Sequence, residues 1–152
     1  RNHSENKALS EHVRSVKSAE LDTIVHSIAK EETAKIDCTE CGNCCGTLQP
    51  PFTNSDIEGI ISNQSVSKEQ LKKEVLVFDA KNQVHYLKQS PCNFLCDKKC
   101  SIYANRPKAC ADYPHLQQPH FKYRIKNVFD NYEICPIVYN TIERLKVSLG
   151  LC

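Results

Sequence analysis

The chain has 152 residues, a net charge of +2, an apolar content of 40%, and 10 cysteines beside only 4 glycines and 7 prolines. This composition excludes disordered and low-complexity chains, and the length predicts one domain over residues 1–152. The small net charge gives no reason to expect a nucleic-acid partner, and no apolar run of about 18 residues predicts a membrane span. Because the sequence begins with Arg1 and contains no Met, a removed N-terminal segment such as a signal peptide stays open.

Residues 1–35 are predicted to form a long N-terminal helix. From Glu5 to Lys35, apolar residues recur mostly at three- and four-residue steps with charged residues between them, which is typical of an amphipathic helix. They are Leu9, Val13, Val16, Leu21, Ile24, Val25 and Ile28. We expect this stripe to pack, either in the core or against a protein partner or a second copy. His12 and His26 are expected to be surface or core residues, not ligands.

Two capping patterns predict short helices after the first cysteine block. One of residues 53–55 is expected to cap a helix that runs to about Ser62. Ser67, with Gln70 three residues later, matches a capping box and predicts a second helix. Residues 84–88 follow a polar turn and alternate in character, which predicts a short strand.

The second half of the chain has two further predicted elements. Residues 91–115 are dense in cysteine, proline and aromatic residues, so we expect an irregular loop. Residues 120–129 alternate and predict a strand. Residues 136–150 predict a helix with Pro136 in its first turn and Gly150 just beyond its end.

Together these elements predict an α+β fold that is mainly α, with little strand. The N-terminal helix (1–35) and the C-terminal helix (136–150) bracket a cysteine-rich core over residues 36–137. Because that core has few regular elements, we expect a metal to staple its irregular centre.

The segment CTECGNCCG (residues 38–46) places four cysteines within eight positions. Disulfides are one interpretation, because ten is an even number, and inert buried thiols are another. Adjacent cysteines bridge each other only with strain, however, and coincidence explains the spacing poorly. Cys38 and Cys41, with two residues between them and Gly42 following, are instead typical of a tight metal-binding turn. Cys41 and Cys44 repeat that spacing.

The adjacent pair Cys44 and Cys45 makes a sharper prediction. Neighbouring side chains tend to diverge, so we expect these thiols to serve different ions or to straddle one polynuclear centre. Further ligands must come from later in the chain, where the available cysteines are Cys92, Cys96, Cys100, Cys110 and Cys135. Cys152, near the end of the sequence, is the expected bystander.

Basic residues among the later cysteines are candidates for balancing thiolate charge. They are Lys98, Lys99, Arg106 and Lys108. A divalent ion held by four thiolates carries a net charge of about −2, which nearby cations and N–H donors offset. Ordinary surface charge is the other interpretation; Arg106 is the cation that we expect beside the site. Candidates for an additional ligand or proton-transfer group are Asp112, Tyr113 and His115.

The strings CTECGNCC and CNFLCDKKCSIYANRPKACADYP, with a later CP, resemble the CxxCxxCC family, described as zinc- or iron-chelating domains, over about residues 36–137. The resemblance implies metal ligands at the cysteines of that signature: Cys38, Cys41, Cys44, Cys45, Cys92, Cys100, Cys110 and Cys135. Cys96 and Cys152 have no counterpart in it, and His115 stands where the family has an aromatic residue. One branch, the flagellin lysine N-methylases, is larger than this chain. No glycine-rich nucleotide loop is visible, so enzymatic activity stays open.

The metal and its role are predicted as follows. Closed thiolate sites favour zinc, whereas Cys38, Cys41 and Cys44, with Pro136 after Cys135, also match the ferredoxin run, so iron or an iron–sulfur cluster is the alternative. We predict a metal-binding protein with one or two thiolate-held centres in a structural or regulatory role. The alternatives are an iron–sulfur enzyme related to protein lysine N-methylases and a thiol-based carrier or sensor of metal. Because such thiols need reducing conditions, we expect a cytoplasmic protein, and no particular partner or substrate is predicted.

Overall fold

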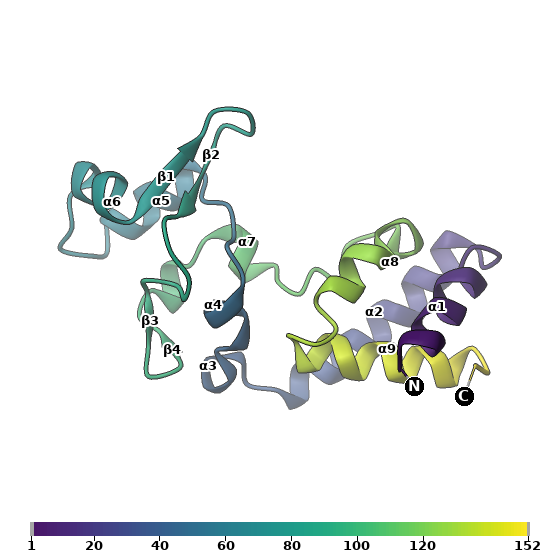
Figure 1. Cartoon of the computed structure of the whole chain (residues 1–152). Coiled ribbons are helices and arrows are strands. Elements are labelled where there is room, and N and C mark those ends of the chain that lie inside the picture. Colours follow the sequence, from purple (N-terminus) through teal and green to yellow (C-terminus); the bar gives the residue numbers. More distant parts are fainter. Residues whose placement is uncertain (1, 152) are drawn as a thin grey trace. The chain divides into compact units, whose positions relative to one another are not determined.

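A computed structural model describes residues 2–151, except for the side chain of Asn2. The chain folds as two compact units (Figure 1). Of the described residues, the helical unit contains 2–37 and 114–151, and the cysteine unit contains 38–113. The single domain expected over residues 1–152 stays a prediction. Within residues 2–151, no helix is both long and apolar enough to cross a membrane.

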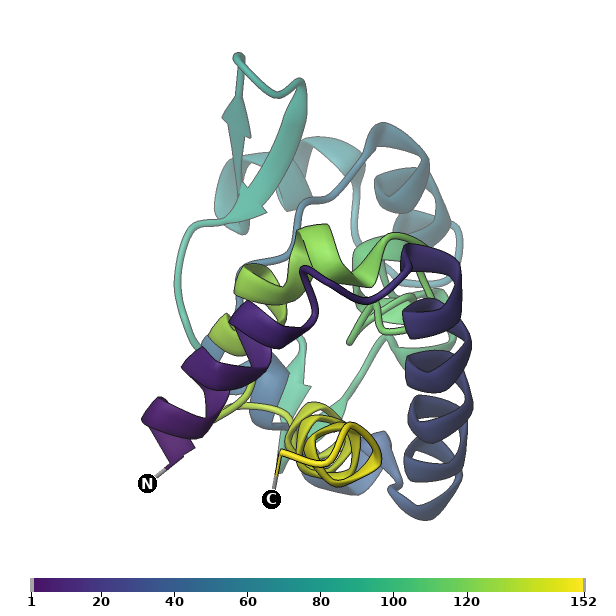
Figure 2. The same ribbon diagram turned by 90° about the vertical axis from the view of Figure 1, so that its right-hand side faces the viewer.

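The helical unit is built from α1 (Asn2–His12), α2 (Ser18–Lys35), α8 (Phe121–Asp130) and α9 (Pro136–Ser148). α2 packs against α8 and α9, and α1 packs against α8; Figure 2 looks almost along the axis of α9 (yellow). The helices bury apolar stripes, as amphipathic helices do. The buried residues include Leu9, Val13, Leu21, Val25, Ile28, Phe121, Ile137, Val138, Ile142 and Leu145.

The N-terminal stretch forms two helices, so the prediction of one long helix over residues 1–35 is wrong. α1 ends at His12, and α2 starts only after a break. The apolar pattern contains the reason, because the step from Val16 to Leu21 is five residues, which does not return to the same face of a continuous helix. Within the break, the Ser15 hydroxyl donates to the His12 carbonyl at 2.7 Å.

Residues 120–129 contain most of the helix α8, so the strand predicted there is wrong. Phe121, Ile125 and Val128 are buried at steps of four and three, which is the helical period. The Asp22 carboxylate, from α2, accepts hydrogen bonds from two backbone N–H groups at the start of α8, at 2.7 and 2.8 Å. The first N–H groups of a helix have no acceptor within the helix and need one from elsewhere. Here the acceptor is Asp22, which lies 98 residues before His120 in the sequence.

The predicted C-terminal helix is confirmed as α9. Pro136 occupies its first turn, and Gly150 follows it at φ 70°, the left-handed conformation that suits glycine after a helix. In residues 2–151 the strands form two small two-stranded sheets. The predicted fold class, α+β and mainly α, is therefore confirmed.

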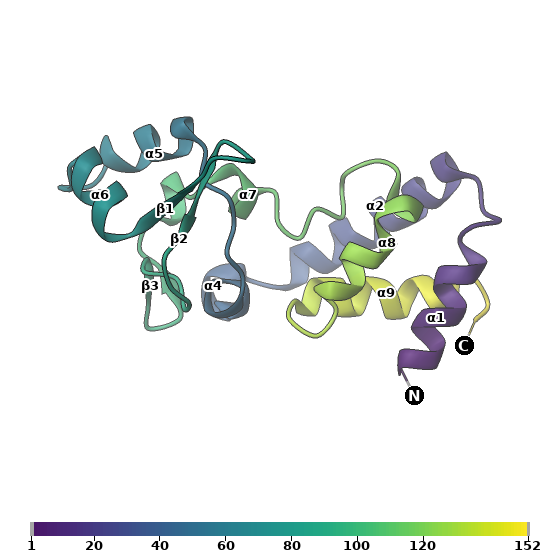
Figure 3. The ribbon, with the colours of Figure 1, turned by 45° about the horizontal axis from the view of Figure 1, so that its top comes forward.

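The cysteine unit consists of short elements joined by loops, as Figure 3 shows. Its helices are α3 (Cys38–Cys41), α4 (Asn43–Thr47), α5 (Asn54–Ile61), α6 (Lys68–Glu74), the 3-10 helix η1 (Tyr103–Asn105) and α7 (Lys108–Ala111). Its antiparallel strand pairs are β1 (Leu76–Asp79) with β2 (Val84–Leu87), and β3 (Leu95–Cys96) with β4 (Lys99–Cys100). Its small core contains Phe52, Ile57, Ile60, Leu71, Leu76, Leu87 and Ile102.

The helix caps predicted for this unit are confirmed. Thr53 is the N-cap of α5: its hydroxyl accepts from the N–H of Asp56, and the Asp56 carboxylate accepts from the N–H of Thr53 at 2.8 Å. The Ser67 hydroxyl caps α6 by accepting from the N–H of Gln70 at 3.1 Å. The strand predicted within residues 84–88 is β2, whereas no sequence pattern predicted its partner β1.

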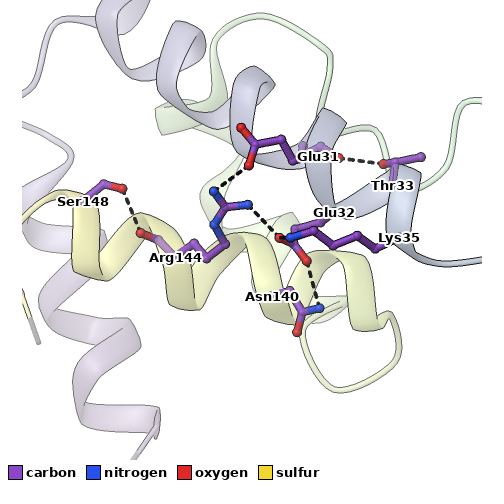
Figure 4. Close-up of polar contacts among 8 residues, drawn as sticks. Glu31, Glu32, Thr33, Lys35, Asn140, Arg144 and Ser148 are labelled. Atoms are coloured by element: carbon purple, nitrogen blue, oxygen red, sulfur yellow. Dashed lines mark hydrogen bonds and ion pairs between the residues drawn. The ribbon is translucent and has the colours of Figure 1, made fainter.

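A buried carboxylate joins two helices of the helical unit. Glu32, in α2, is only 3% exposed. It accepts hydrogen bonds from Lys35 and Arg144, both at 2.7 Å, and from Asn140 at 3.1 Å (Figure 4). The bond from Lys35, followed by that from Arg144, lowers the pKa of Glu32 to about 2. Because Arg144 and Asn140 belong to α9, this carboxylate ties α9 to the end of α2.

We predict that Glu32→Gln lowers the free energy of unfolding by about 1–3 kcal/mol, because charge-assisted hydrogen bonds to a buried carboxylate are lost. Glu31→Gln is the matched control. Glu31 bonds the same arginine, but its side chain is 54% exposed, so we expect a loss of only about 0.5 kcal/mol. Chemical unfolding followed by circular dichroism measures both variants.

The difference in unfolding free energy between the wild type and Glu32→Gln should depend on pH. Because the pKa of Glu32 lies below its ordinary value of 4.5, its stabilising effect is complete above that pH and is lost as the pH falls toward 2. The stability gap between the wild type and Glu32→Gln should therefore narrow over that interval. A gap that stays constant with pH would contradict this role of Glu32.

Candidate metal centre

Cys44 and Cys45 are neighbours in α4, and their thiols interact. The Cys45 thiol donates a hydrogen bond to the Cys44 sulfur, which lowers the pKa of Cys44 to about 6 and raises the pKa of Cys45. That the two thiols serve different ions stays a prediction.

Cys92 is joined to this pair through the backbone. The N–H of Cys92 donates to the carbonyl of Cys45 at 2.9 Å. The Ser90 hydroxyl donates to the carbonyl of Gly46 at 3.2 Å. These bonds hold the loop before β3 against α4. Burial raises the pKa of Cys92, and negative charge on Cys100 raises it further.

Cys110 is brought in by α7. The N–H of Lys108, at the start of α7, donates to one oxygen of the Asp56 carboxylate at 2.9 Å, while the other oxygen serves the cap of α5. Asp56 therefore fixes the helix that carries Cys110 to the start of α5. The sequence marks Asp56 only as suited to a helix N-terminus. Its second bond spans 52 residues, so no local pattern could reveal it.

Five thiols influence one another and are here called the thiol cluster. They are Cys44, Cys45, Cys92, Cys100 and Cys110. Burial, and after it negative charge on the other cysteines, raises the pKa of Cys110 to about 12. The five come from four segments, namely α4, the loop before β3, β4 and α7. The structure thus places five of the eight cysteines predicted as ligands within electrostatic range of one another.

The donor chemistry of the thiol cluster fits zinc or iron. Both metals take thiolate ligands in closed protein sites, and a bound cation would reverse the repulsion that raises these pKa values. In residues 2–151, no three histidine, cysteine, aspartate or glutamate side chains already form a group that could hold an ion. An ion would therefore have to draw the sulfur atoms closer together.

Cys38 and Cys41 stand at the two ends of α3, which lies beside β4 (Figure 1). Gly42 follows with φ +64°, and a Cβ on it would stand 2.6 Å from the carbonyl oxygen of Lys98. A glycine with positive φ agrees with the sharp turn expected after Cys41. The structure also explains why a larger residue does not fit at this position: the β3–β4 hairpin approaches the Gly42 backbone too closely to leave room for a Cβ.

Two of the other predicted residues belong to the helical unit. Cys135 belongs to the helical unit, directly before α9, and is 7% exposed. His115 belongs to the same unit, and its Nδ1 lies 3.3 Å from the side-chain amide nitrogen of Gln118. Cys152 lies outside the described residues. The nine described cysteines are all thiols.

Arg106 is a cation whose charge reaches the thiol cluster. It counteracts the rise in the pKa of Cys110, which is the kind of effect predicted for it. The Arg106 guanidinium lies over the Tyr103 ring, 3.9 Å from the ring centroid. Two of the lysines that were candidates for balancing thiolate charge have acidic partners: Lys99 with Glu40 at 2.7 Å, and Lys108 with Asp112 at 2.6 Å.

Comparison with known proteins identifies one family. The model of the family described as "CxxCxxCC: Putative zinc- or iron-chelating domain" matches residues 37–136, about two thirds of the chain. The matched segment includes every cysteine of the predicted ligand set, from Cys38 to Cys135. No curated protein and no solved structure matches the chain.

We predict that Gly42→Ala lowers the stability of the cysteine unit by about 2 kcal/mol or more, because the left-handed φ and the approach of Lys98 both exclude a Cβ. Gly59→Ala is the matched control. Nothing lies within 4 Å of a Cβ at Gly59, so alanine should stabilise α5 by about 0.5–1 kcal/mol. Chemical unfolding compares the variants, and equal stabilities would contradict the tight turn.

Proposed function

We propose that this chain, which belongs to the CxxCxxCC family of zinc- or iron-chelating domains, is a metal-binding protein in which one or two thiolate-held ions staple the cysteine unit. The thiol cluster is the observation that carries the proposal. Its five cysteines come from four segments and alter one another's pKa values. Negative charge on one of these half-buried thiols disfavours negative charge on the others, and a bound cation removes that cost.

The weak framework of the cysteine unit supports a structural role for the ion. α3, α4 and α7 contain only four or five residues each, which is too short for a helix to be stable by itself. These three helices carry Cys38, Cys41, Cys44, Cys45 and Cys110. Metal binding that gathers such segments adds its free energy to folding.

Zinc is the metal that we propose, because closed thiolate sites suit its tetrahedral coordination. Iron or an iron–sulfur cluster is the alternative, because the spacing of Cys38, Cys41 and Cys44 also matches the ferredoxin run. Elemental analysis of protein purified without oxygen separates the two. A colourless protein with stoichiometric zinc supports our proposal, and a brown protein that bleaches on reduction contradicts it in favour of the cluster. Both sites need reduced thiols, so we infer a reducing compartment such as the cytoplasm.

We predict that removing the metal with a chelator, under reducing conditions, unfolds the cysteine unit and leaves the helical unit folded. The physical reason is that the helical unit has the larger apolar core, whereas the cysteine unit has a small core and the short helices α3, α4 and α7, which depend on the ion. Hydrogen exchange of the full chain measures this directly. Amides of α5, α7 and β2 should lose protection, and those of α2 and α9 should keep it.

Adding zinc back is the control for this experiment, and it should restore the lost protection. Metal that leaves readily while the cysteine unit stays protected would contradict a structural role and favour the carrier interpretation. Equal loss of protection in both units would also contradict the proposal, because it would mean that the ion does not act on the cysteine unit in particular.

A further inference from the structure

The two cysteines of the β3–β4 hairpin, Cys96 and Cys100, lie on opposite faces of it. Leu95 pairs with Cys100, and Cys96 pairs with Lys99. Residues that lie opposite each other in an antiparallel pair share a face, and neighbours along a strand alternate. The turn between the strands has positive φ at both of its residues, 47° and 67°, which is typical of a type I′ turn and keeps this register. Cys96 therefore shares a face with Lys99, while Cys100 is on the other face.

The face that carries Lys99 is turned toward α3. The Lys99 amino group lies 2.7 Å from the Glu40 carboxylate, and Glu40 sits between Cys38 and Cys41 in the four-residue helix α3. The approach of Gly42 to the hairpin turn locks α3 in place beside β4. Cys96 therefore lies on the hairpin face that is turned toward α3, the helix that carries Cys38 and Cys41.

The opposite face of the hairpin belongs to the thiol cluster. Cys100 packs against the small core of the cysteine unit, and negative charge on it raises the pKa values of Cys45 and Cys110. One short hairpin thus separates two sets of thiols. The α3 set is more open to solvent, because Cys38 and Cys96 are exposed and Cys41 is only half-buried.

We propose that Cys96 joins Cys38 and Cys41 in a second, solvent-facing zinc site that is distinct from the thiol cluster. This inference rests on the proposed metal-binding function. The spacing of Cys38 and Cys41 suits a pair of zinc ligands, and Cys96 supplies the third thiolate when zinc draws the hairpin and α3 together. Three protein ligands leave the fourth position to water or to an incoming thiolate. The site therefore exchanges its ion more readily than the thiol cluster does.

The test compares the wild type with Cys96→Ser in the full chain, loaded with zinc under reducing conditions. A chromogenic zinc chelator then measures how much zinc leaves quickly and how much leaves slowly. We expect the wild type to release two classes of zinc, and Cys96→Ser to lose the quick class while the slow class stays unchanged. Cys96→His is the conservative variant, and it should restore the quick class because imidazole also binds zinc.

Cobalt substitution gives an independent readout. The thiolate-to-cobalt absorption of the loaded protein should fall in Cys96→Ser, with unchanged circular dichroism showing that the variant is folded. A zinc-loaded wild type whose release and absorption are unaffected by Cys96→Ser would overturn the second site and leave the proposed function standing. A wild type that takes up no zinc, cobalt or iron would overturn both.

Discussion

The close approach of Gly42 to the Lys98 carbonyl is the contact on which the cysteine unit depends. A Cβ at Gly42 would stand 2.6 Å from that oxygen, so only glycine lets the turn between α3 and α4 rest on the β3–β4 hairpin. Cysteines lie in α3 and α4, on either side of this turn, and also in both strands of the hairpin. One backbone contact therefore sets where most thiols of the unit lie relative to each other.

The electrostatic interactions among these thiols explain why a bound cation would stabilise their thiolate forms. Burial and mutual negative charge raise the pKa values of Cys92 and Cys110, and only one partner of the Cys44–Cys45 pair is favoured as a thiolate. Arg106 offsets a part of this cost at Cys110. A divalent ion would offset this cost more strongly than Arg106 does, because it stabilises several thiolates at once.

Local patterns predicted local structure well, and contacts between distant residues decided the rest. The caps at Thr53 and Ser67 involve partners three residues away, so the sequence contains the whole signal. The start of α8 is capped by Asp22 from a distant helix, a signal that residues 120–129 do not contain, and their alternating pattern predicts a strand instead. Likewise, cysteine spacing identified the candidate ligands, but the hairpin register that separates Cys96 from Cys100 appears only in the folded chain.

The central claim is that an ion held by cysteine thiolates binds the cysteine unit. X-ray absorption spectroscopy at the metal edge, on the metal-loaded full chain, tests it most directly. The account predicts a first shell made mainly of sulfur, at about 2.3 Å if the metal is zinc. A first shell made mainly of nitrogen or oxygen would contradict the account, because it would mean that residues other than these cysteines hold the metal.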